Sequence, residues 1–550
     1  MIAHSVDEPL YYLHNFRQVL VWVSQRYADL LDEPERAFID AFEQLPAPAQ
    51  ALLVRMVMRK GEWFRTDKLD YAEIGDPQAA LQPLMALGWV CGRQPLALEQ
   101  LFSLLRKEEL ALYFAGQLAR PRAAKADLLA QMQALEPCAR PLHEWFANCP
   151  LQVVHWRMQP LCDRFRLLFF GNLYQDWSDF VLADMGMLRF EKVPFSDDSR
   201  ALRQRADVDA AIALHRCAEQ LEQGEQPCQL LAVLDGLPCD TPWLARRRAR
   251  LLFSIGQQCE RSGDWALALT VYALSSHPES RIRQVRVLER SEQWVRAQAL
   301  AQQMANPPNN PLEVQALARM LPRLARKLGG PPTARRRAAV VTPIELELPA
   351  AMAALGVEEA VRVHLAQAGG QVYYVENTLF NSLFGLLCWE AIFAPVPGAF
   401  FHPFQVAPHD LHEADFQQRR SALFDTCLAR LDDGSHVQAI LDCYAAKHGL
   451  QSPFVFWSML SPELLEHALA CLPAEHLKQC FLRLLQDIRN NRAGMPDLIQ
   501  LWPEQGRYCM VEVKGPGDRL QDNQVRWLEF CRLHDLPVAV CHVRWCEAAA

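Results

Sequence analysis

Apolar residues recur three and four positions apart along most of the first 330 residues, which is the spacing of amphipathic helices. Residues 1–45 follow this spacing and are predicted to be helical. Residues 46–92 are predicted to form two or three short helices that end in a strand-like tip, the pattern of a small winged-helix-like unit. Residues 95–136 predict a helix, a turn and a second helix, so we expect one DNA-binding region over 46–137.

The middle of the chain changes pattern twice. Residues 138–204 contain an aromatic stretch that predicts a connector of mixed helix and strand, packed on the region before it. Residues 205–330 return to repeated amphipathic helices that resemble degenerate tetratricopeptide-like pairs, most clearly in GDWALALTVY. The sequence GGPP at 329–332 is typical of a linker, and a last domain is predicted over 340–550.

Composition places this chain among ordinary globular proteins. It has 550 residues, enough for three or four domains, with 51% hydrophobic and 22% charged residues. We find no apolar run long enough to cross a bilayer and no secretory signal, so we expect a cytoplasmic protein without membrane contact. The 17 cysteines include no CxxC pair, which argues against disulfides and structural zinc. Cys541, His542 and Cys546 lie close together, but packing explains them better than zinc does.

The formal net charge of −8 does not indicate nucleic acid, so a DNA-binding protein of this composition must concentrate positive charge locally. One candidate surface is Arg120, Arg122 and Lys125 at a predicted helix start, a place suited to a phosphate. A second is the basic run in the helical block, formed by Arg246, Arg247, Arg248 and Arg250. For each run, a solvated helix face is an equally good interpretation.

Two predicted strands near the C-terminus carry the strongest chemical signal. Asp497 follows Pro496 and opens the strand LIQLW, and a turn leads to the strand YCMVEVKG. Alternation places Glu512 and Lys514 on one face of the second strand and Val513 on the other. Asp497 and Glu512 are 512 − 497 = 15 residues apart, so a hairpin can bring two carboxylates and an ammonium together.

That set suits phosphodiester hydrolysis of the PD-(D/E)xK type. Carboxylate oxygens hold Mg²⁺ or Mn²⁺, as one or two ions, and a lysine can stabilise charge in the transition state. The main-chain carbonyl of Val513 is a candidate further ligand, and Glu376 is a candidate third carboxylate at the start of the predicted helix ENTLFNSLFGLLCWEAIF. The alternatives are a surface hairpin with a Glu–Lys pair and a Glu376 that only favours the helix dipole.

The stretch GMPDLIQLW…YCMVEVKGPGDRLQDNQVRWLEFCRLHDLPVAVCHV resembles the VRR-NUC domain. With VENTLFNSLFGLLCWEAIF and LLVRMVMRKGEWFRTDKLDY, it resembles the Fanconi-anaemia-associated nuclease family over most of the chain. The resemblance implies α-helical DNA-binding regions of winged-helix and SAP type, a tetratricopeptide-like region and an α/β nuclease domain with a mixed central sheet. It also implies cleavage near 5′ flaps, 5′-to-3′ exonuclease activity and a role in interstrand-crosslink repair.

The same resemblance assigns roles residue by residue. Glu376, Asp497 and Glu512 match the acidic metal ligands, Val513 matches a main-chain ligand and Lys514 matches the catalytic lysine. Gln405, in FHPFQVAP, falls near an active-site glutamine of the family. A histidine of the eukaryotic 5′-phosphate pocket falls on Gln284, and we find no ubiquitin-binding zinc finger, so recruitment through ubiquitin is not expected.

We therefore expect a bacterial, nucleoid-associated enzyme that cuts branched or 5′-flap DNA as a monomer. One alternative is a nuclease that resolves four-way junctions with the same chemistry. Another is a non-catalytic scaffold, which the acidic and basic set at Asp497, Glu512 and Lys514 disfavours, because such polar groups are costly to position without a use.

Overall fold

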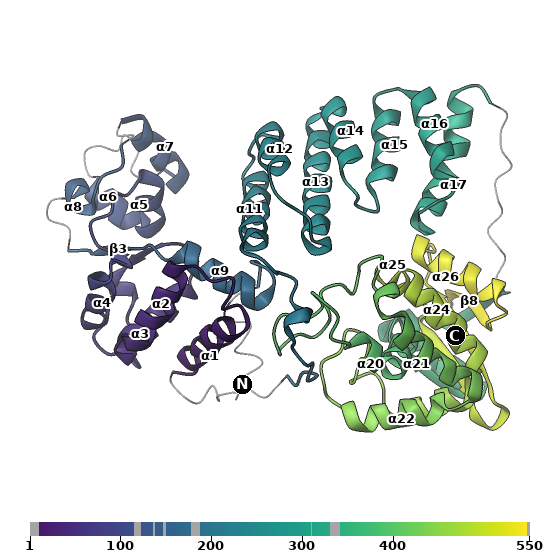
Figure 1. The fold of residues 1–550 in the computed structure, drawn as a ribbon. Coiled ribbons are helices and arrows are strands. Elements are labelled where there is room, and N and C mark those ends of the chain that lie inside the picture. Colours follow the sequence, from purple (N-terminus) through teal and green to yellow (C-terminus); the bar gives the residue numbers. More distant parts are fainter. Residues whose placement is uncertain are drawn as a thin grey trace. The chain divides into compact units, whose positions relative to one another are not determined.

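The structure is a computed structural model that describes residues 10–114, 123–135, 138–146, 150–175, 177, 188–309, 311–330 and 342–546. The chain forms two compact units, which Figure 1 shows from the N-terminus in purple to the C-terminus in yellow. The first unit contains residues 1–188 and 202–215, and the second contains residues 189–201 and 216–550. Within the described ranges, no helix is long and apolar enough to cross a membrane.

The first unit is mainly helical. Its elements are α1 (Tyr11–Arg26), α2 (Glu33–Gln44), α3 (Ala47–Val57), β1 (Trp63–Arg65), η1 (Thr66–Lys68), α4 (Pro77–Ala86), β2 (Val90–Cys91), α5 (Leu98–Leu104), α6 (Lys107–Tyr113), α7 (Lys125–Leu135), α8 (Leu142–Trp145), β3 (Val153–Trp156) and α9 (Gln159–Phe170). The helix α11 (Arg205–Glu222) continues from this unit into the second. Two helices joined by one turn were expected over 95–136, whereas the described residues of this range form three helices, α5, α6 and α7.

A small antiparallel sheet joins strands from two segments that the sequence analysis assigned to different regions. Its strand order is β1-β3-β2, with Trp63 opposite His155 and Val90 opposite Trp156. The strand β3 lies in the expected connector and pairs with β1 and β2, which lie before residue 137. Beside the sheet, the ring of Phe38 stacks on that of Trp89 with centroids 4.4 Å apart.

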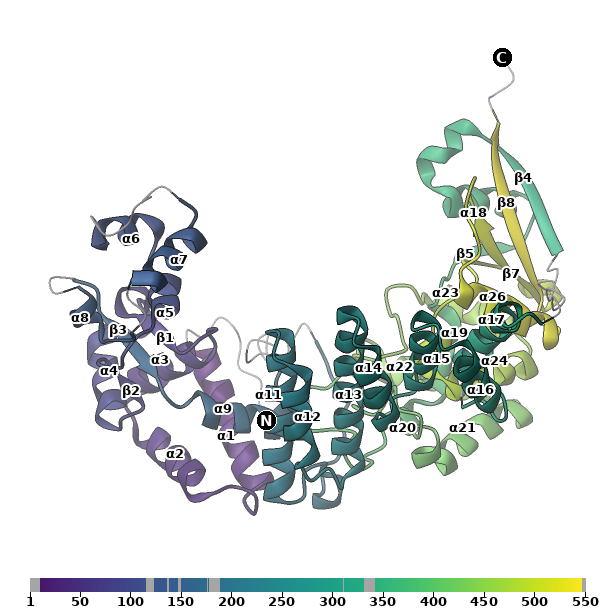
Figure 2. The same ribbon diagram turned by 90° about the horizontal axis from the view of Figure 1, so that it is seen from above.

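The second unit begins with the helical block, seen in teal in Figure 2. Its helices are α12 (Pro227–Asp235), α13 (Pro242–Ser262), α14 (Trp265–Leu274), α15 (Ser280–Arg290), α16 (Trp294–Met304) and α17 (Pro311–Lys327). Gly256 allows α14 to lie against α13, because a Cβ at this position would be 2.6 Å from the ring of Tyr272. The side chain of Asp264 accepts the N–H of Leu267 at 3.0 Å and starts α14.

The C-terminal part of the second unit contains a five-stranded sheet. Its elements are β4 (Thr342–Pro349), η3 (Ala350–Leu355), α18 (Val357–Gln367), β5 (Gln371–Tyr374), α19 (Leu379–Leu387), α20 (Trp389–Ile392), η4 (Gln418–Arg420), α21 (Ser421–Asp433), α22 (His436–Lys447), α23 (Pro462–Cys471), α24 (Ala474–Gln486), α25 (Ile488–Asn491), β6 (Leu498–Trp502), η5 (Pro503–Gln505), β7 (Arg507–Lys514), α26 (Asp522–Leu533) and β8 (Val538–Cys546). The strand order is β4-β8-β7-β6-β5. The pairs β4–β8 and β7–β8 are parallel, whereas β5–β6 and β6–β7 are antiparallel, so the predicted mixed sheet is confirmed.

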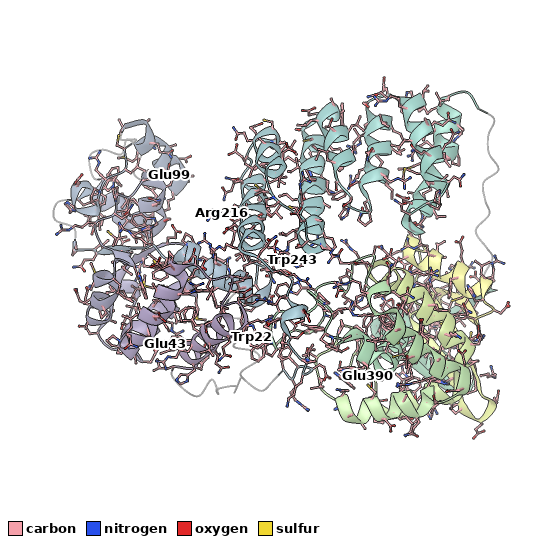
Figure 3. The ribbon with its side chains drawn as sticks, viewed as in Figure 1. Trp22, Glu43, Glu99, Arg216, Trp243 and Glu390 are labelled. Atoms are coloured by element: carbon pink, nitrogen blue, oxygen red, sulfur yellow. The ribbon has the colours of Figure 1, made fainter. Side chains whose placement is uncertain are left out.

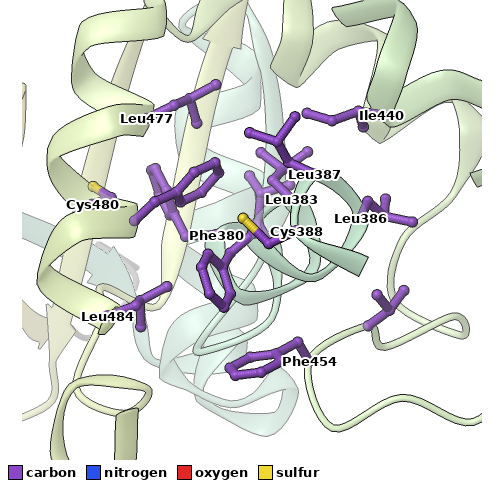
Figure 4. Packing of buried hydrophobic residues seen from close by; sticks show 14 of the residues in the cluster. Phe380, Leu383, Leu386, Leu387, Cys388, Ile440, Phe454, Leu477, Cys480 and Leu484 are labelled. Atoms are coloured by element: carbon purple, nitrogen blue, oxygen red, sulfur yellow. The ribbon is translucent and has the colours of Figure 1, made fainter. Parts of the chain in front are cut away.

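Each face of this sheet packs on its own apolar cluster. One cluster contains Leu498, Val511 and Val513 together with Ala360 of α18. The other is larger and joins the opposite face to α19, α21, α24 and α26. Figure 4 shows part of this larger cluster, where side chains of α19 meet those of α24. The alternation of β7 between the two clusters confirms the predicted faces of that strand.

We expect Phe384→Ala to lower the free energy of unfolding by about 3–5 kcal/mol, because truncating a fully buried ring leaves a cavity. The ring of Phe384 lies 4.9 Å from that of Phe454 and 5.6 Å from that of Phe481. Leu423→Ala, on the exposed side of α21, is the control and should cost about 0.5 kcal/mol or less. Urea unfolding of the two variants measures the difference, and equal losses would contradict the packing described here.

Candidate active site

The predicted hairpin of β6 and β7 is present. Leu498 pairs with Val511, and continuing this antiparallel register by one residue places Asp497 opposite Glu512. The carboxylate of Asp497 accepts the main-chain N–H of Val513 through Oδ2 at 2.8 Å. Gly494 brings the preceding loop close to α26, because a Cβ there would be 2.7 Å from the main chain of Asn523.

Glu512 and Lys514 lie on the same face of β7, as the alternation predicts. Glu512 is 0% exposed and Lys514 is 8% exposed. The ammonium Nζ of Lys514 lies 2.8 Å from Glu512 Oε1, which is an ion pair. Among the described residues, neither Glu512 oxygen has a standard hydrogen-bond partner, so the ion pair with Lys514 is what compensates this buried carboxylate. Buried carboxylate oxygens of this kind are suited to bind a cation.

The two carboxyl groups share an environment that favours their neutral forms. Burial raises the pKa of Asp497 to about 6, although the N–H of Val513 opposes this shift. Burial and the neighbouring Asp497 raise the pKa of Glu512 to about 7, and Lys514 opposes that shift. A cation that entered the site would replace these protons and remove the repulsion between the carboxylates.

Glu376 lies in a turn and not at the start of a helix, which corrects the prediction. The N–H of Thr378 donates to the carbonyl of Val375 at 2.9 Å and closes the turn. Asn377 has a φ of 53°, so the backbone leaves the helical region there and α19 begins at Leu379. The charge of Glu376 contributes to the raised pKa of both Asp497 and Glu512, so the three carboxylates interact.

The donor set fits a hard divalent cation. Asp497 and Glu512 offer carboxylate oxygens, and Glu376 adds a third carboxylate from a separate segment. Among the described residues, no three His, Cys, Asp or Glu side chains are grouped tightly enough to form a ready-made metal centre. The main-chain carbonyl of Val513 as a ligand stays a prediction.

Gln405 makes hydrogen bonds within its own loop, and its active-site role stays a prediction. Its Oε1 accepts the N–H groups of Phe401 and His402, and its Nε2 donates to the carbonyl of Ala407 at 3.2 Å. The amide therefore stabilises its own loop, and none of its described hydrogen bonds reaches Asp497 or Glu512.

Most of the predicted DNA-binding side chains that the structure describes contact other residues of the chain. Arg120 and Arg122 lie outside the described residues, and Lys125 donates to the carbonyl of Leu105 at 2.8 Å. Arg248 is half-buried, and Arg250 is exposed and lies 3.8 Å from Glu413.

Arg246 forms ion pairs with Glu413 and Asp415 at 3.5 and 3.4 Å. Arg247 lies over the ring of Trp243, the residue labelled in Figure 3, at 3.9 Å. The run from 246 to 250 as a DNA-binding surface stays a prediction, and the side chain of Arg250 is 68% exposed.

Arginines from two separate segments influence two histidines. Burial lowers the pKa of His412, and the charges of Arg492, Arg489 and Arg250 lower it further. Burial likewise lowers the pKa of His277, and the charges of Arg489 and Arg250 lower it further. The sequence offers no local signal for this group, because its members come from four separate segments.

Three domain descriptions match this chain. Residues 10–91 match "FAN1, HTH domain", residues 95–145 match "Fanconi anemia-associated nuclease SAP domain" and residues 431–545 match "VRR-NUC domain". The Fanconi-associated nuclease 1 homolog of Pseudomonas aeruginosa is 58% identical over 541 residues, which are 98% of this chain and 97% of that protein. The Oryza sativa homolog is 25% identical over 97% of this chain, which spans 62% of that longer protein.

A solved structure shows the same similarity in three dimensions. The crystal structure of paFAN1 bound to 2-nt 5′-flap DNA with a gap superposes with a TM-score of 0.91 at 57% identity. The superposition covers 99% of this chain and 100% of that one.

We expect Glu512→Gln to stabilise the metal-free protein at pH 8. The folded-state pKa of Glu512, about 7, lies above the ordinary value of 4.5. The native state therefore binds more protons than the unfolded state in this window, and stability falls as pH rises through it. A neutral amide avoids that loss, so the gain should be on the order of 1–3 kcal/mol at pH 8 and should shrink as pH falls toward 4.5.

Urea unfolding in EDTA at pH 5 and pH 8 measures this gain. Glu463→Gln, at the exposed start of α23, is the control and should show no such pH-dependent gain. A difference between Glu512→Gln and the unsubstituted protein that is the same at both pH values would contradict the assignment.

Proposed function

Because this chain belongs to the Fanconi-associated nuclease family, whose members are structure-specific nucleases, we propose that it hydrolyses DNA near 5′ flaps with a divalent metal. The proposal includes 5′-to-3′ exonuclease activity and a role in interstrand-crosslink repair. The 57% identical paFAN1 has crystal structures with 2-nt and 1-nt 5′-flap DNA, and this supports the same substrate class here. We further propose that the chain acts as a monomer on branched DNA.

The observation that carries the proposal is the buried carboxylate of Glu512, which lies beside Asp497 and Lys514 and whose oxygens have no standard hydrogen-bond partner in the described part of the chain. Asp497, Glu512 and Glu376 would hold Mg²⁺ or Mn²⁺, with the carbonyl of Val513 as a further oxygen. Such a cation supplies Lewis-acid stabilisation of negative charge on a phosphate.

Lys514 has a separate role in this proposal. A charged ammonium has no lone pair, so it cannot be a metal ligand. Its 8% exposure places a positive charge in a region of low dielectric, where it can stabilise charge that develops on the reacting phosphate. The α-helices beneath the sheet fix its strand, so this charge is positioned before the substrate binds.

We expect Lys514→Ala to lower the single-turnover cleavage rate about 10²–10³-fold, because a positioned charge acts mainly on the transition state. Metal affinity and DNA affinity should change little. Lys478→Ala is the matched control, since that lysine forms a 2.5 Å ion pair with Asp432 away from the site. Near-normal cleavage by Lys514→Ala, or loss of metal binding with the fold retained, would refute this role.

Digestion of end-labelled 5′-flap, 3′-flap, four-way and duplex DNA, each with Mg²⁺, Mn²⁺ or EDTA, tests the proposed function directly. We expect metal-dependent cutting close to the 5′ flap and none in EDTA. A preference for the four-way substrate would favour the junction-resolving alternative, and an absence of cutting with either metal would favour the scaffold.

A further inference from the structure

Glu376 is the one proposed metal ligand that comes from outside the β6–β7 hairpin. Two side chains hold its carboxylate. The hydroxyl of Tyr374 donates to Oε2 at 2.6 Å, and the amide Nδ2 of Asn377 donates to Oε1 at 3.2 Å. Both oxygens of this flexible side chain are therefore oriented by neighbours in its own turn.

Asn377 also connects the turn to the loop before Asp497. Its Oδ1 accepts the main-chain N–H of Met495 at 3.1 Å. One amide therefore contacts the carboxylate of Glu376 at one end and the chain two residues before Asp497 at the other. The N–H of Val375 adds a parallel connection, because it donates to the carbonyl of Asp497 at 2.8 Å.

The backbone of Asn377 is itself held in place. Asn381, which is almost fully buried, donates through Nδ2 to the carbonyl of Asn377 at 2.7 Å and to that of Arg492 at 2.8 Å. The φ of 53° at Asn377 is a conformation that asparagine tolerates better than most residues. Several hydrogen bonds therefore fix the turn that carries Glu376 relative to the segment that carries Asp497.

We infer that Asn377 and Tyr374 are positioning residues that orient Glu376 toward the cation bound by Asp497 and Glu512. This inference rests on the proposed metal-dependent function. Hydrogen bonds to a ligating carboxylate fix its direction, and losing such a partner typically weakens metal binding about 10–100-fold. Neither residue was indicated by the spacing of charged residues, because neither carries a charge.

Asn377→Gly isolates the side chain of Asn377, because glycine adopts the same positive φ without strain. Tyr374→Phe removes a single hydroxyl from a ring that is 39% exposed, so it preserves the fold even if the glycine variant is unstable. Gln500→Ala is the matched control. It removes a buried amide of the same sheet, which donates to the carbonyls of Leu365 and Gly369, away from Glu376.

Calorimetric titration of the full chain with Mn²⁺, without DNA, measures the effect. We expect both Asn377→Gly and Tyr374→Phe to bind Mn²⁺ about tenfold or more weakly than the unsubstituted protein, and Gln500→Ala to bind it normally. In cleavage assays, the two variants should require correspondingly more Mg²⁺ yet approach the normal rate at saturating Mg²⁺. A purely structural role would lower the rate at every Mg²⁺ concentration.

Normal Mn²⁺ affinity in Tyr374→Phe would overturn the role of Tyr374. Normal affinity in Asn377→Gly, or an equal loss in Gln500→Ala, would overturn the role of Asn377. If the unsubstituted protein bound no Mn²⁺ and did not cut DNA, the proposed function itself would fail, which is a distinct result.

Discussion

The buried carboxylate of Glu512 imposes an electrostatic cost that the rest of the nuclease sheet must offset. Glu512 has no exposed surface, and neither of its oxygens has a hydrogen-bond partner among the described residues. Moving an ionised carboxylate out of water costs several kcal/mol unless a nearby charge compensates it. Lys514 supplies one positive charge, whereas Asp497 and Glu376 add negative charge. The metal-free site is therefore unfavourable, and packing elsewhere in the sheet must offset its cost.

That packing also determines which side chains reach the site. On β7, Val511 and Val513 belong to the apolar cluster beneath α18, whereas Met510 belongs to the cluster under α19 and α24. A shift of one residue would exchange the two faces and bury Glu512 and Lys514 under α18. Because both clusters are apolar, such a shift would lose hydrophobic burial on both faces. The same contacts that stabilise the sheet thus fix the positions of the chemical groups.

The part of the site that could be predicted from sequence is local. Strand alternation and one turn place Asp497, Glu512 and Lys514 together, so a short stretch of sequence contains the information. Glu376 lies 497 − 376 = 121 residues earlier, and its position depends on the pairing of β5 with β6. Its turn depends on the positive φ of Asn377, which apolar periodicity does not reveal. The ion pairs of the basic run could not be predicted for a similar reason, because the partners of Arg246 follow it by more than 160 residues.

A site with three carboxylates repels DNA, and a chain with a net charge of −8 does not compensate for this as a whole. The compensation must therefore be local. Arg489 and Arg492 lie eight and five residues before Asp497, and their charges, with that of Arg250, lower the pKa of the buried His412. Asp487 opposes that shift and Glu413 lies 3.8 Å from Arg250, so acidic neighbours already offset part of this positive charge. A phosphate would have to compete with these carboxylates for the same arginines, which links the attraction of DNA to ion pairs within the protein.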